Sequence, residues 1–413
     1  MYYYRENGAC FASQLPGLPL PKSTLPEPDV PLTFLFDTPP ENRRASFCVT
    51  DPRQLTAPES VAWLDPGRIG GTSPELPEEL SLRIARRTLR AVNLRHPKWR
   101  DATGSTLGPR RKRVHLLAVG DVGGTMLIGL KLLGGDCIET LGICDLNPNI
   151  VARWTAEMSQ IAWPWDYDAL PNVRAVDPEH LFDCDVFLFA ATKAVPAVDS
   201  EVPDVRMAQL EANRAIVEHY ARKARDAEFR GQFIVLSDPV DPLCRAAYLA
   251  SNLGEDGCRD ERGLRAEQIQ GFGLGVMNAR AAALARQEVK YRSFLEEGRS
   301  FGPHGEGLVI ANSIARYDDE ISRQLTERVK TANLRIRELG FKPYVAPALS
   351  SGAFQLLLTL RGQWHCGSVC LGGVWFGCRC RNTPAGLETE ELALPDALYA
   401  RLLETEQSLS SIL

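Results

Sequence analysis

From Val114 onwards the chain alternates between short apolar runs and longer stretches with an amphipathic pattern. The apolar runs read VHLLAVG, CIETLGICD, VFLFAAT and FIVLSD. Runs of this kind are typical of strands buried on both faces of a parallel sheet. Because helical stretches separate them, the pattern predicts an α/β fold with a doubly wound parallel sheet over residues 111–250. Ligands of such sheets bind at the carboxyl ends of the strands.

The pattern becomes mixed after about residue 250. Two long helices are expected, over Val276–Glu296 and Asp318–Leu339, and a strand hairpin over Trp364–Arg381. An amphipathic helix is expected over Pro395–Leu413. Residues 251–413 are therefore predicted to form an α+β unit.

Residues 1–110 read as an extension of a different kind. The first 75 residues are rich in proline and turn residues, with short apolar stretches such as PLTFLF and ASFCVT. They predict loops with a few short strands. Leu76–Leu94 has apolar positions near three-and-four spacing and is expected to be helical. The sequence of this extension contains no recognisable catalytic constellation.

Composition narrows the class of protein. A formal charge of -5 argues against a nucleic-acid partner. No apolar run approaches the roughly 18 residues of a membrane span, and the N-terminus lacks the pattern of a secretory signal. The eleven cysteines are scattered and odd in number, which favours reduced, buried thiols and a cytoplasmic protein.

Four of the cysteines cluster near His365, at Cys366, Cys370, Cys378 and Cys380. Their spacing is not a standard zinc pattern, although Cys378 and Cys380 would share one face of a strand. We expect buried thiols and no metal here.

A glycine turn follows the first buried strand, in the order Ala118, Gly120, Val122, Gly123. Such a turn lets backbone N–H groups approach a pyrophosphate at the start of a helix, as in Rossmann domains. Asp145 ends the next strand, where a carboxylate accepts the ribose hydroxyls and repels the extra phosphate of NADP. The alternatives are a glycine turn that only packs a helix and an aspartate that only caps one. We favour an NAD site.

Further segments follow in order: VFLFAATKAVP, DVRMAQLEANRAIV, FIVLSDPVDPLC, GFGLGVMNAR and FGPHGEG. In this order and at these spacings they resemble the lactate/malate dehydrogenase family over roughly residues 112–413. The resemblance implies a lactate/malate dehydrogenase-like C-terminal domain. It also implies hydride transfer between NAD and a small 2-hydroxy or 2-keto acid.

The resemblance also implies roles for individual residues. His304 exchanges a proton, Arg280 binds the substrate carboxylate, and Arg206, on a loop that closes over the substrate, polarises its carbonyl. Asn213 matches a cofactor-binding position, and Ser351 lies where the family lines the substrate pocket. Ser351 and its neighbour Ser350 are alternatively explained as helix caps.

Two positions depart from the family pattern. Met277 replaces the aspartate that pairs with the histidine, and a methionine cannot orient an imidazole. Asp238 replaces an asparagine that donates to the substrate oxygen, and an ionised aspartate only accepts. We hypothesise that Asp238 has become the carboxylate partner of His304. The alternative is an inactive or regulatory homologue that binds dinucleotide without turnover.

Two further features bear on substrate and assembly. Malate enzymes carry an arginine where this chain has Ala197, so a monocarboxylic acid with an uncharged side chain is expected. The segment IAWPWDY brings together Trp163, Trp165 and Tyr167, either as a surface patch or as the edge of a core. The helix before it forms dimer contacts in the family, so a homo-oligomer, either a dimer or a tetramer, is expected.

Overall fold

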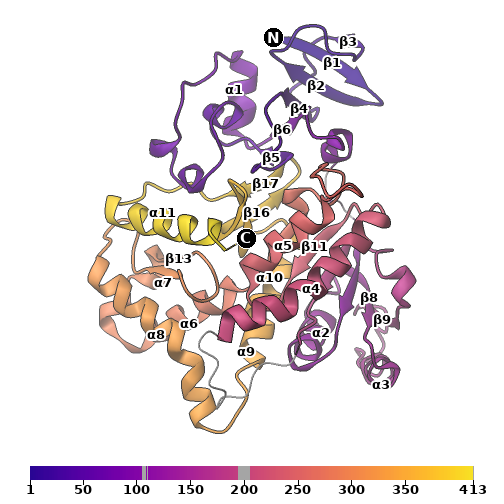
Figure 1. Ribbon diagram of the computed structural model, residues 1–413, viewed down its shortest axis with the longest axis vertical. Coiled ribbons are helices and arrows are strands. Elements are labelled where there is room, and N and C mark those ends of the chain that lie inside the picture. Colours follow the sequence, from indigo (N-terminus) through magenta and orange to yellow (C-terminus); the bar gives the residue numbers. More distant parts are fainter. Residues whose placement is uncertain (105–107, 109, 194–204, 413) are drawn as a thin grey trace.

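The computed structural model describes residues 1–104, 108, 110–193 and 205–412, with only the backbone of 205–208. The N-terminal region forms one end of the molecule, drawn in indigo at the top of Figure 1. Helices α8 (Asp319–Glu338) and α9 (Val345–Pro347) lie at the opposite end. Among the described residues, no helix is both long and apolar enough to cross a membrane.

A nine-stranded sheet forms the centre of the molecule, in the order β17-β16-β15-β12-β11-β10-β7-β8-β9. Six neighbouring strands run parallel, and their chain order across the sheet is 3-2-1-4-5-6, the Rossmann arrangement. The predicted doubly wound sheet is confirmed. The parallel strands are β7 (Lys112–Leu117), β8 (Ile138–Cys144), β9 (Asn172–Ala175), β10 (Val186–Phe189), β11 (Gln232–Val235) and β12 (Ile269–Gly271).

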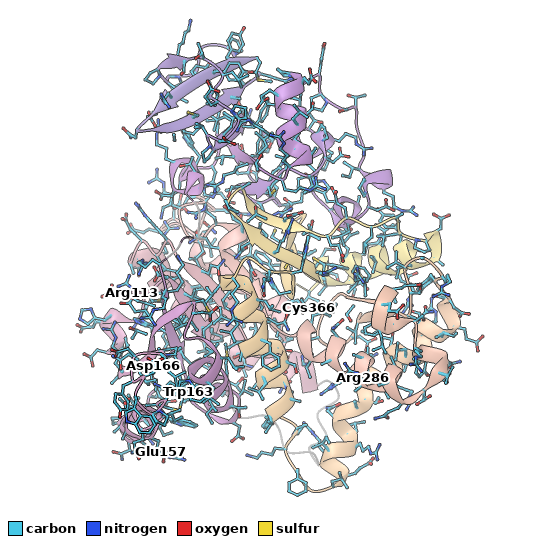
Figure 2. All side chains as sticks on the ribbon, turned by 180° about the vertical axis from the view of Figure 1, so that it is seen from behind. Arg113, Glu157, Trp163, Asp166, Arg286 and Cys366 are labelled. Atoms are coloured by element: carbon cyan, nitrogen blue, oxygen red, sulfur yellow. The ribbon has the colours of Figure 1, made fainter. Side chains whose placement is uncertain are left out.

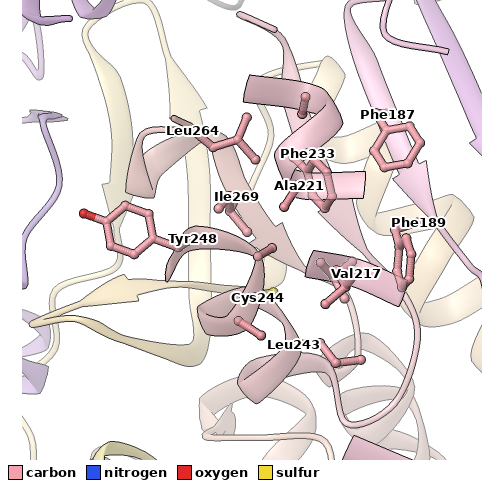
Figure 3. Close-up of a cluster of buried hydrophobic side chains, with 14 of the residues drawn as sticks. Phe187, Phe189, Val217, Ala221, Phe233, Leu243, Cys244, Tyr248, Leu264 and Ile269 are labelled. Carbon is pink, nitrogen blue, oxygen red and sulfur yellow. The ribbon is translucent and has the colours of Figure 1, made fainter. Parts of the chain in front are cut away.

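Both faces of the sheet are covered, and β10 shows why its sequence is apolar throughout. Phe187 and Phe189 point to one face and pack with Val217 and Leu243 (Figure 3). Leu188 points to the other face, into a second cluster. Helices α4 (Val205–Asp226) and α5 (Val240–Ser251) cover the first face, and α2 (Asp121–Leu133) and α10 (Phe354–Leu360) cover the second. Each large apolar side chain contributes roughly 1.5–3 kcal/mol by burial.

The C-terminal part joins the same sheet. Strands β15 (His365–Leu371), β16 (Val374–Thr383) and β17 (Gly386–Thr389) are antiparallel and extend it beyond β12. The predicted hairpin and the helices α8 and α11 (Asp396–Ser410) are present. Since β12 follows residue 250, the parallel sheet continues past the predicted boundary. The domain limits themselves stay predictions.

One predicted helix of this part is too long. Helix α6 covers Leu274–Gln287, and Glu288 then adopts an extended backbone conformation. A short turn, η7 (Val289–Tyr291), and the one-turn helix α7 (Phe294–Glu297) complete the predicted span. Strands β13 (Arg299–Phe301) and β14 (Val309–Ala311) follow as an antiparallel pair.

The N-terminal region is a folded sheet with more order than its proline-rich sequence predicts. Its order is β3-β1-β2-β4-β6-β5, and β2, β4 and β6 run parallel. The strands are β1 (Tyr2–Glu6), β2 (Ala9–Ser13), β3 (Lys22–Ser23), β4 (Leu32–Phe36), β5 (Ser46–Cys48) and β6 (Leu89–Asn93).

The predicted helix Leu76–Leu94 is wrong over its second half. Only α1 (Glu78–Ala85) is helical, and Arg87 has a φ of 60°, which ends the helical path. Leu89 and Val92 then pack into clusters on opposite faces of the sheet. Apolar spacing alone cannot separate a short buried strand from a helix.

Polar contacts fasten this region to the rest of the chain. The carboxylate of Glu267 accepts the Ala45 N–H at 3.0 Å and the Ser46 hydroxyl at 2.9 Å. Arg87 pairs with Glu391 at 2.8 Å. These contacts lie around β17 and the start of β12, so the extension covers one end of the central sheet.

Candidate active site

The glycine turn joins β7 to α2 and is built by close backbone approaches. A Cβ atom on Gly123 would lie 2.2 Å from the Ala118 carbonyl oxygen, so this position requires glycine. Gly120, the residue before α2, has no atom within 4 Å of such a Cβ position and no side-chain cap. The turn therefore presents open space and uncapped N–H groups at the start of a helix, which suits a pyrophosphate.

Ala118 stands where the glycine turn of a Rossmann domain has its first glycine, and it has a φ of 72°. The left-handed region costs an ordinary L-residue roughly 1 kcal/mol. The alanine at this position therefore carries a backbone penalty.

Asp145 follows β8 and ties two loops together. Its Oδ2 accepts the Val119 N–H at 2.9 Å, and its Oδ1 accepts the Asn147 N–H at 3.0 Å. Helix α3 (Pro148–Ser159) is capped by Asn147 instead, so the interpretation of Asp145 as its cap is wrong. Each carboxylate oxygen keeps a lone pair for a ribose hydroxyl. The partly buried side chain of Val122 packs against the apolar cluster under α2.

His304 lies in the loop between β13 and β14 and contacts Asp238, which follows β11. The distance from His304 Nδ1 to Asp238 Oδ1 is 3.0 Å. His304 Nε2 is buried and forms no hydrogen bond with any described residue. A Cβ on Gly273 would lie 2.6 Å from His304 Cβ, so the bare glycine backbone makes room for the histidine.

A second carboxylate, Asp241, supports the histidine from inside the protein. Asp241 is buried, and its Oδ1 accepts the Ser368 hydroxyl at 2.5 Å. Burial raises the pKa of Asp241 to about 6, although the Ser368 hydroxyl and the His304 backbone N–H donate to the carboxylate and oppose the shift. Asp241 was not predicted as a site residue; the second aspartate in SDPVD was the available signal.

Arg280 and Met277 lie one turn apart on α6. Met277 is buried in the apolar cluster between α6 and α8. Arg280 Nη1 donates to the Val329 carbonyl at 3.3 Å and lies 3.7 Å from Met277 Sδ. Its Nε and Nη2 make no hydrogen bond within the part of the chain that the structure describes. Burial lowers the pKa of Arg280, and the nearby Asp238 charge opposes that shift.

Two residues that were predicted to contact the cofactor or the substrate form hydrogen bonds within the protein. Asn213 is buried; its amide donates to the Asp238 carbonyl at 2.7 Å and its Oδ1 accepts the Lys193 N–H at 2.9 Å. Ser351 donates to the Gly273 carbonyl at 2.7 Å and accepts the Val276 N–H at 2.9 Å. These contacts hold the backbone around Asp238 and the start of α6. The Ser351 hydroxyl proton is thereby committed to the fold and not available to a substrate.

Two predictions concern residues that are not fully described. Arg206 lies in the first turn of α4, but its side chain is outside the described residues. Ala197 also lies outside them.

The aromatic segment after α3 is on the surface, which decides between its two interpretations. Trp163, Trp165 and Tyr167 are 59%, 91% and 70% exposed. Figure 2 shows Trp163 and Asp166 at the margin of the molecule. Rings this exposed do not cover a core edge within one chain.

The cysteines near His365 are free thiols. Cys380 Sγ lies 3.4 Å from His365 Nε2, and burial raises the pKa of Cys366 to about 12. Figure 2 labels Cys366 on this hairpin. Within the described ranges, no group of three or more His, Cys, Asp or Glu side chains is arranged to hold a metal ion.

No family model matches the chain. Malate dehydrogenase of Sulfurimonas denitrificans is 24% identical over 224 residues, which are 54% of this chain and 63% of that protein. The chain thus aligns with less than two thirds of that relative's length.

Solved structures agree with this similarity. The minor L-lactate dehydrogenase of Enterococcus mundtii has a TM-score of 0.58 and 18% identity, covering 73% of this chain and 97% of that one. Malate dehydrogenase from Archaeoglobus fulgidus, in complex with NADH, has a TM-score of 0.56 and 16% identity, covering 72% and 97%. The chain has the fold of lactate and malate dehydrogenases, and the resemblance seen in its sequence is confirmed.

Replacing Ala118 with glycine should stabilise the protein, because glycine adopts a φ of 72° without strain. We expect the free energy of unfolding to rise by roughly 0.5–1 kcal/mol, measured by urea denaturation. The matched control is Ala152→Gly on the exposed face of α3, which should lower it by about 1 kcal/mol. Equal losses in both variants would contradict the strained turn.

Replacing Asp241 with asparagine should remove a pH dependence of stability. The folded protein keeps the Asp241 proton up to about pH 6, whereas the unfolded chain releases it near pH 4. Stability from this group is therefore present at acid pH and lost as the pH rises from about 4 to about 6. Between about pH 4.5 and 7.5, wild type should lose on the order of 2 kcal/mol relative to Asp241→Asn. Asp168→Asn, at an exposed site, should follow wild type; parallel curves for all three proteins would refute the shift.

Proposed function

We propose that this protein is an NAD-dependent oxidoreductase. It transfers a hydride between NAD and a small 2-hydroxy or 2-keto monocarboxylic acid. The observation that carries the proposal is the His304–Asp238 pair, with Nδ1 bonded to the carboxylate and Nε2 buried without a described partner. Such an imidazole is oriented for proton exchange, and its second nitrogen is not committed to a described partner.

Asp238 fixes which nitrogen of His304 carries the proton. The carboxylate accepts from Nδ1–H, so the neutral ring presents the Nε2 lone pair. In the oxidation direction, Nε2 takes the hydroxyl proton while the C–H hydrogen leaves as hydride and a carbonyl forms. Asp238 then stabilises the imidazolium. In this proposal the carboxylate that the family carries at the Met277 position has moved to the end of β11.

NAD, when bound, supplies the hydride acceptor, and the residues around the glycine turn would hold it. Gly120 and Gly123, with the Val122 backbone, would face the pyrophosphate, and Asp145 the ribose. A carboxylate at this position favours NAD over NADP. Asn213 would contribute indirectly, because its amide holds the backbone of Asp238.

Arg280 would bind the substrate carboxylate through the donors that α6 and α8 leave available. Two parallel N–H groups of a guanidinium match a carboxylate and fix its orientation. Arg206 would polarise the carbonyl, as the resemblance implies. Ala197 offers no second cation, so we propose a substrate with an uncharged side chain rather than malate, the substrate named for the sequence relative.

The buried free thiols favour a cytoplasmic location. The exposed rings of Trp163, Trp165 and Tyr167 favour a homo-oligomer in which they are covered.

A second candidate is a homologue that binds dinucleotide without turnover. Met277, buried among apolar side chains, favours it, because the usual partner of the histidine is missing there. The two candidates share NADH binding and differ in catalysis.

The decisive experiment measures NADH oxidation with a panel of 2-keto monocarboxylic acids. We expect turnover by wild type and a loss of roughly 10²–10⁴ in kcat for Asp238→Asn, with NADH affinity unchanged. His304→Gln should cost about as much, and the double variant little more, because the pair acts as a unit. Asp166→Asn, an exposed carboxylate far from the site, is the control. NADH binding without turnover of any acid would favour the second candidate. Wild-type turnover in Asp238→Asn would contradict the proposal that Asp238 is the carboxylate partner of His304.

Replacing Arg280 with glutamine should damage substrate binding selectively. The neutral amide cannot form a charged, two-point contact with a carboxylate, so KM for the keto acid should rise roughly 100-fold or more. Calorimetry should show NADH binding as in wild type and no binding of oxamate to the NADH complex. An unchanged KM would remove Arg280 from the site.

A further inference from the structure

The N-terminal region contains a cavity of its own, with a volume of about 280 Å³. Four leucines and Trp99 form its apolar wall, and Asp37, Arg95 and Arg100 form its charged part. This volume equals that of about nine water molecules in the liquid, so it suits a small ligand. The solved dehydrogenases are matched over 97% of their length and cover 73% of this chain, and the unmatched quarter is about the size of residues 1–110.

The cavity lies where parallel sheets bind ligands. Strands β2, β4 and β6 run in the same direction, and Leu15, Asp37 and Leu94 follow their carboxyl ends. All three residues line the cavity. Ligands of open α/β sheets bind outside these ends, because loops from neighbouring strands converge there.

Hydrogen bonds and ring contacts hold the wall of the cavity in place. Asn93 is buried; its amide donates to the Thr38 carbonyl at 3.0 Å and its Oδ1 accepts the Arg95 N–H at 3.1 Å. The Trp99 ring meets Phe11 edge-on at 6.0 Å. The ends of β4 and β6 and the aromatic wall are therefore fixed before any ligand binds, which lowers the entropy cost of binding.

Arg95 supplies the unused hydrogen-bond donors. Its Nε donates to the Asp37 carboxylate, while its two terminal amino groups bond to no described residue. The side chain is 54% exposed. Arg100 uses its Nε and Nη2 on Glu6 and places its guanidinium 4.3 Å from the Trp99 ring centroid. Each of the two arginines has one carboxylate partner, Asp37 for Arg95 and Glu6 for Arg100. The cavity thus combines an apolar wall with an oriented guanidinium whose terminal amino groups bond to no described residue.

We propose that this cavity binds a small organic anion that joins one carboxylate to a compact apolar body. The carboxylate pairs with the terminal amino groups of Arg95, and the apolar body lies against Trp99 and the leucines. Asp37 keeps Arg95 oriented toward the ligand. The site belongs to the N-terminal region and is independent of the dehydrogenase proposed above.

The test uses full-length protein labelled with fluorotryptophan and observed by fluorine NMR. The Trp99 resonance, one of seven, is assigned with Trp99→Phe. Hydrocinnamate serves as the probe, and we expect a saturable shift of this resonance with Kd of about 0.1–1 mM. Hydrocinnamamide has the same shape without the charge and should bind at least tenfold more weakly.

Variants separate the cavity from other anion sites. Arg95→Gln should weaken hydrocinnamate binding roughly tenfold, whereas Arg86→Gln, an exposed arginine at the end of α1, should not change it. Arg280→Gln should leave the Trp99 shift in place, so that binding at the proposed active site is read separately. A Trp99 resonance unmoved at about 10 mM probe would overturn the proposal. Equal binding of the amide, or of Arg95→Gln and wild type, would overturn it as well.

Discussion

The hydrogen bond between His304 and Asp238 joins the two parts of the chain that form the proposed active site. Asp238 follows a central strand of the parallel sheet, whereas His304 lies between β13 and β14 in the C-terminal part. Asn213 on α4 holds the backbone of Asp238 through a 2.7 Å hydrogen bond, and the buried carboxylate of Asp241 lies near the backbone N–H of His304. The position of the half-exposed Asp238 carboxylate therefore depends on buried polar groups of neighbouring elements.

In the proposed site, Asp238 supplies beside His304 the carboxylate that the family pattern places at position 277. A methionine in the apolar cluster between α6 and α8 adds packing at a site where an aspartate would need a partner. The side chain of Asp238 is 52% exposed, so its ionised form loses less hydration than an aspartate buried at position 277 would. The exchange has a price on the substrate side, since an aspartate cannot donate to the substrate oxygen as an asparagine does. Stabilisation of that oxygen would then rest on His304 and Arg206.

Much of the central sheet was predictable because its strands are apolar on both faces and separated by helices. The contact between His304 and Asp238 was predictable from motif order together with the missing aspartate at position 277. The hydrogen bonds of Asn213 and Ser351 were not predictable, because they join segments that are distant in sequence, as between Ser351 and Gly273. The N-terminal sheet was missed for a local reason: its strands are short, and β6 continues the apolar spacing of α1 after the left-handed Arg87. Tertiary packing, not local propensity, decides such segments.

The N-terminal region also covers an exposed edge of the central sheet. Strand β17 is an edge strand, and edge strands leave unpaired backbone groups that promote aggregation. Arg87 pairs with Glu388 of this strand at 3.5 Å, and Arg90 donates to the Pro384 carbonyl at 2.5 Å, just before it. The extension therefore covers this edge with arginine side chains that bond to residues in and next to β17. Because it approaches the sheet at the edge far from the glycine turn, it can carry a ligand cavity without obstructing the carboxyl ends of β7, β8 and β11.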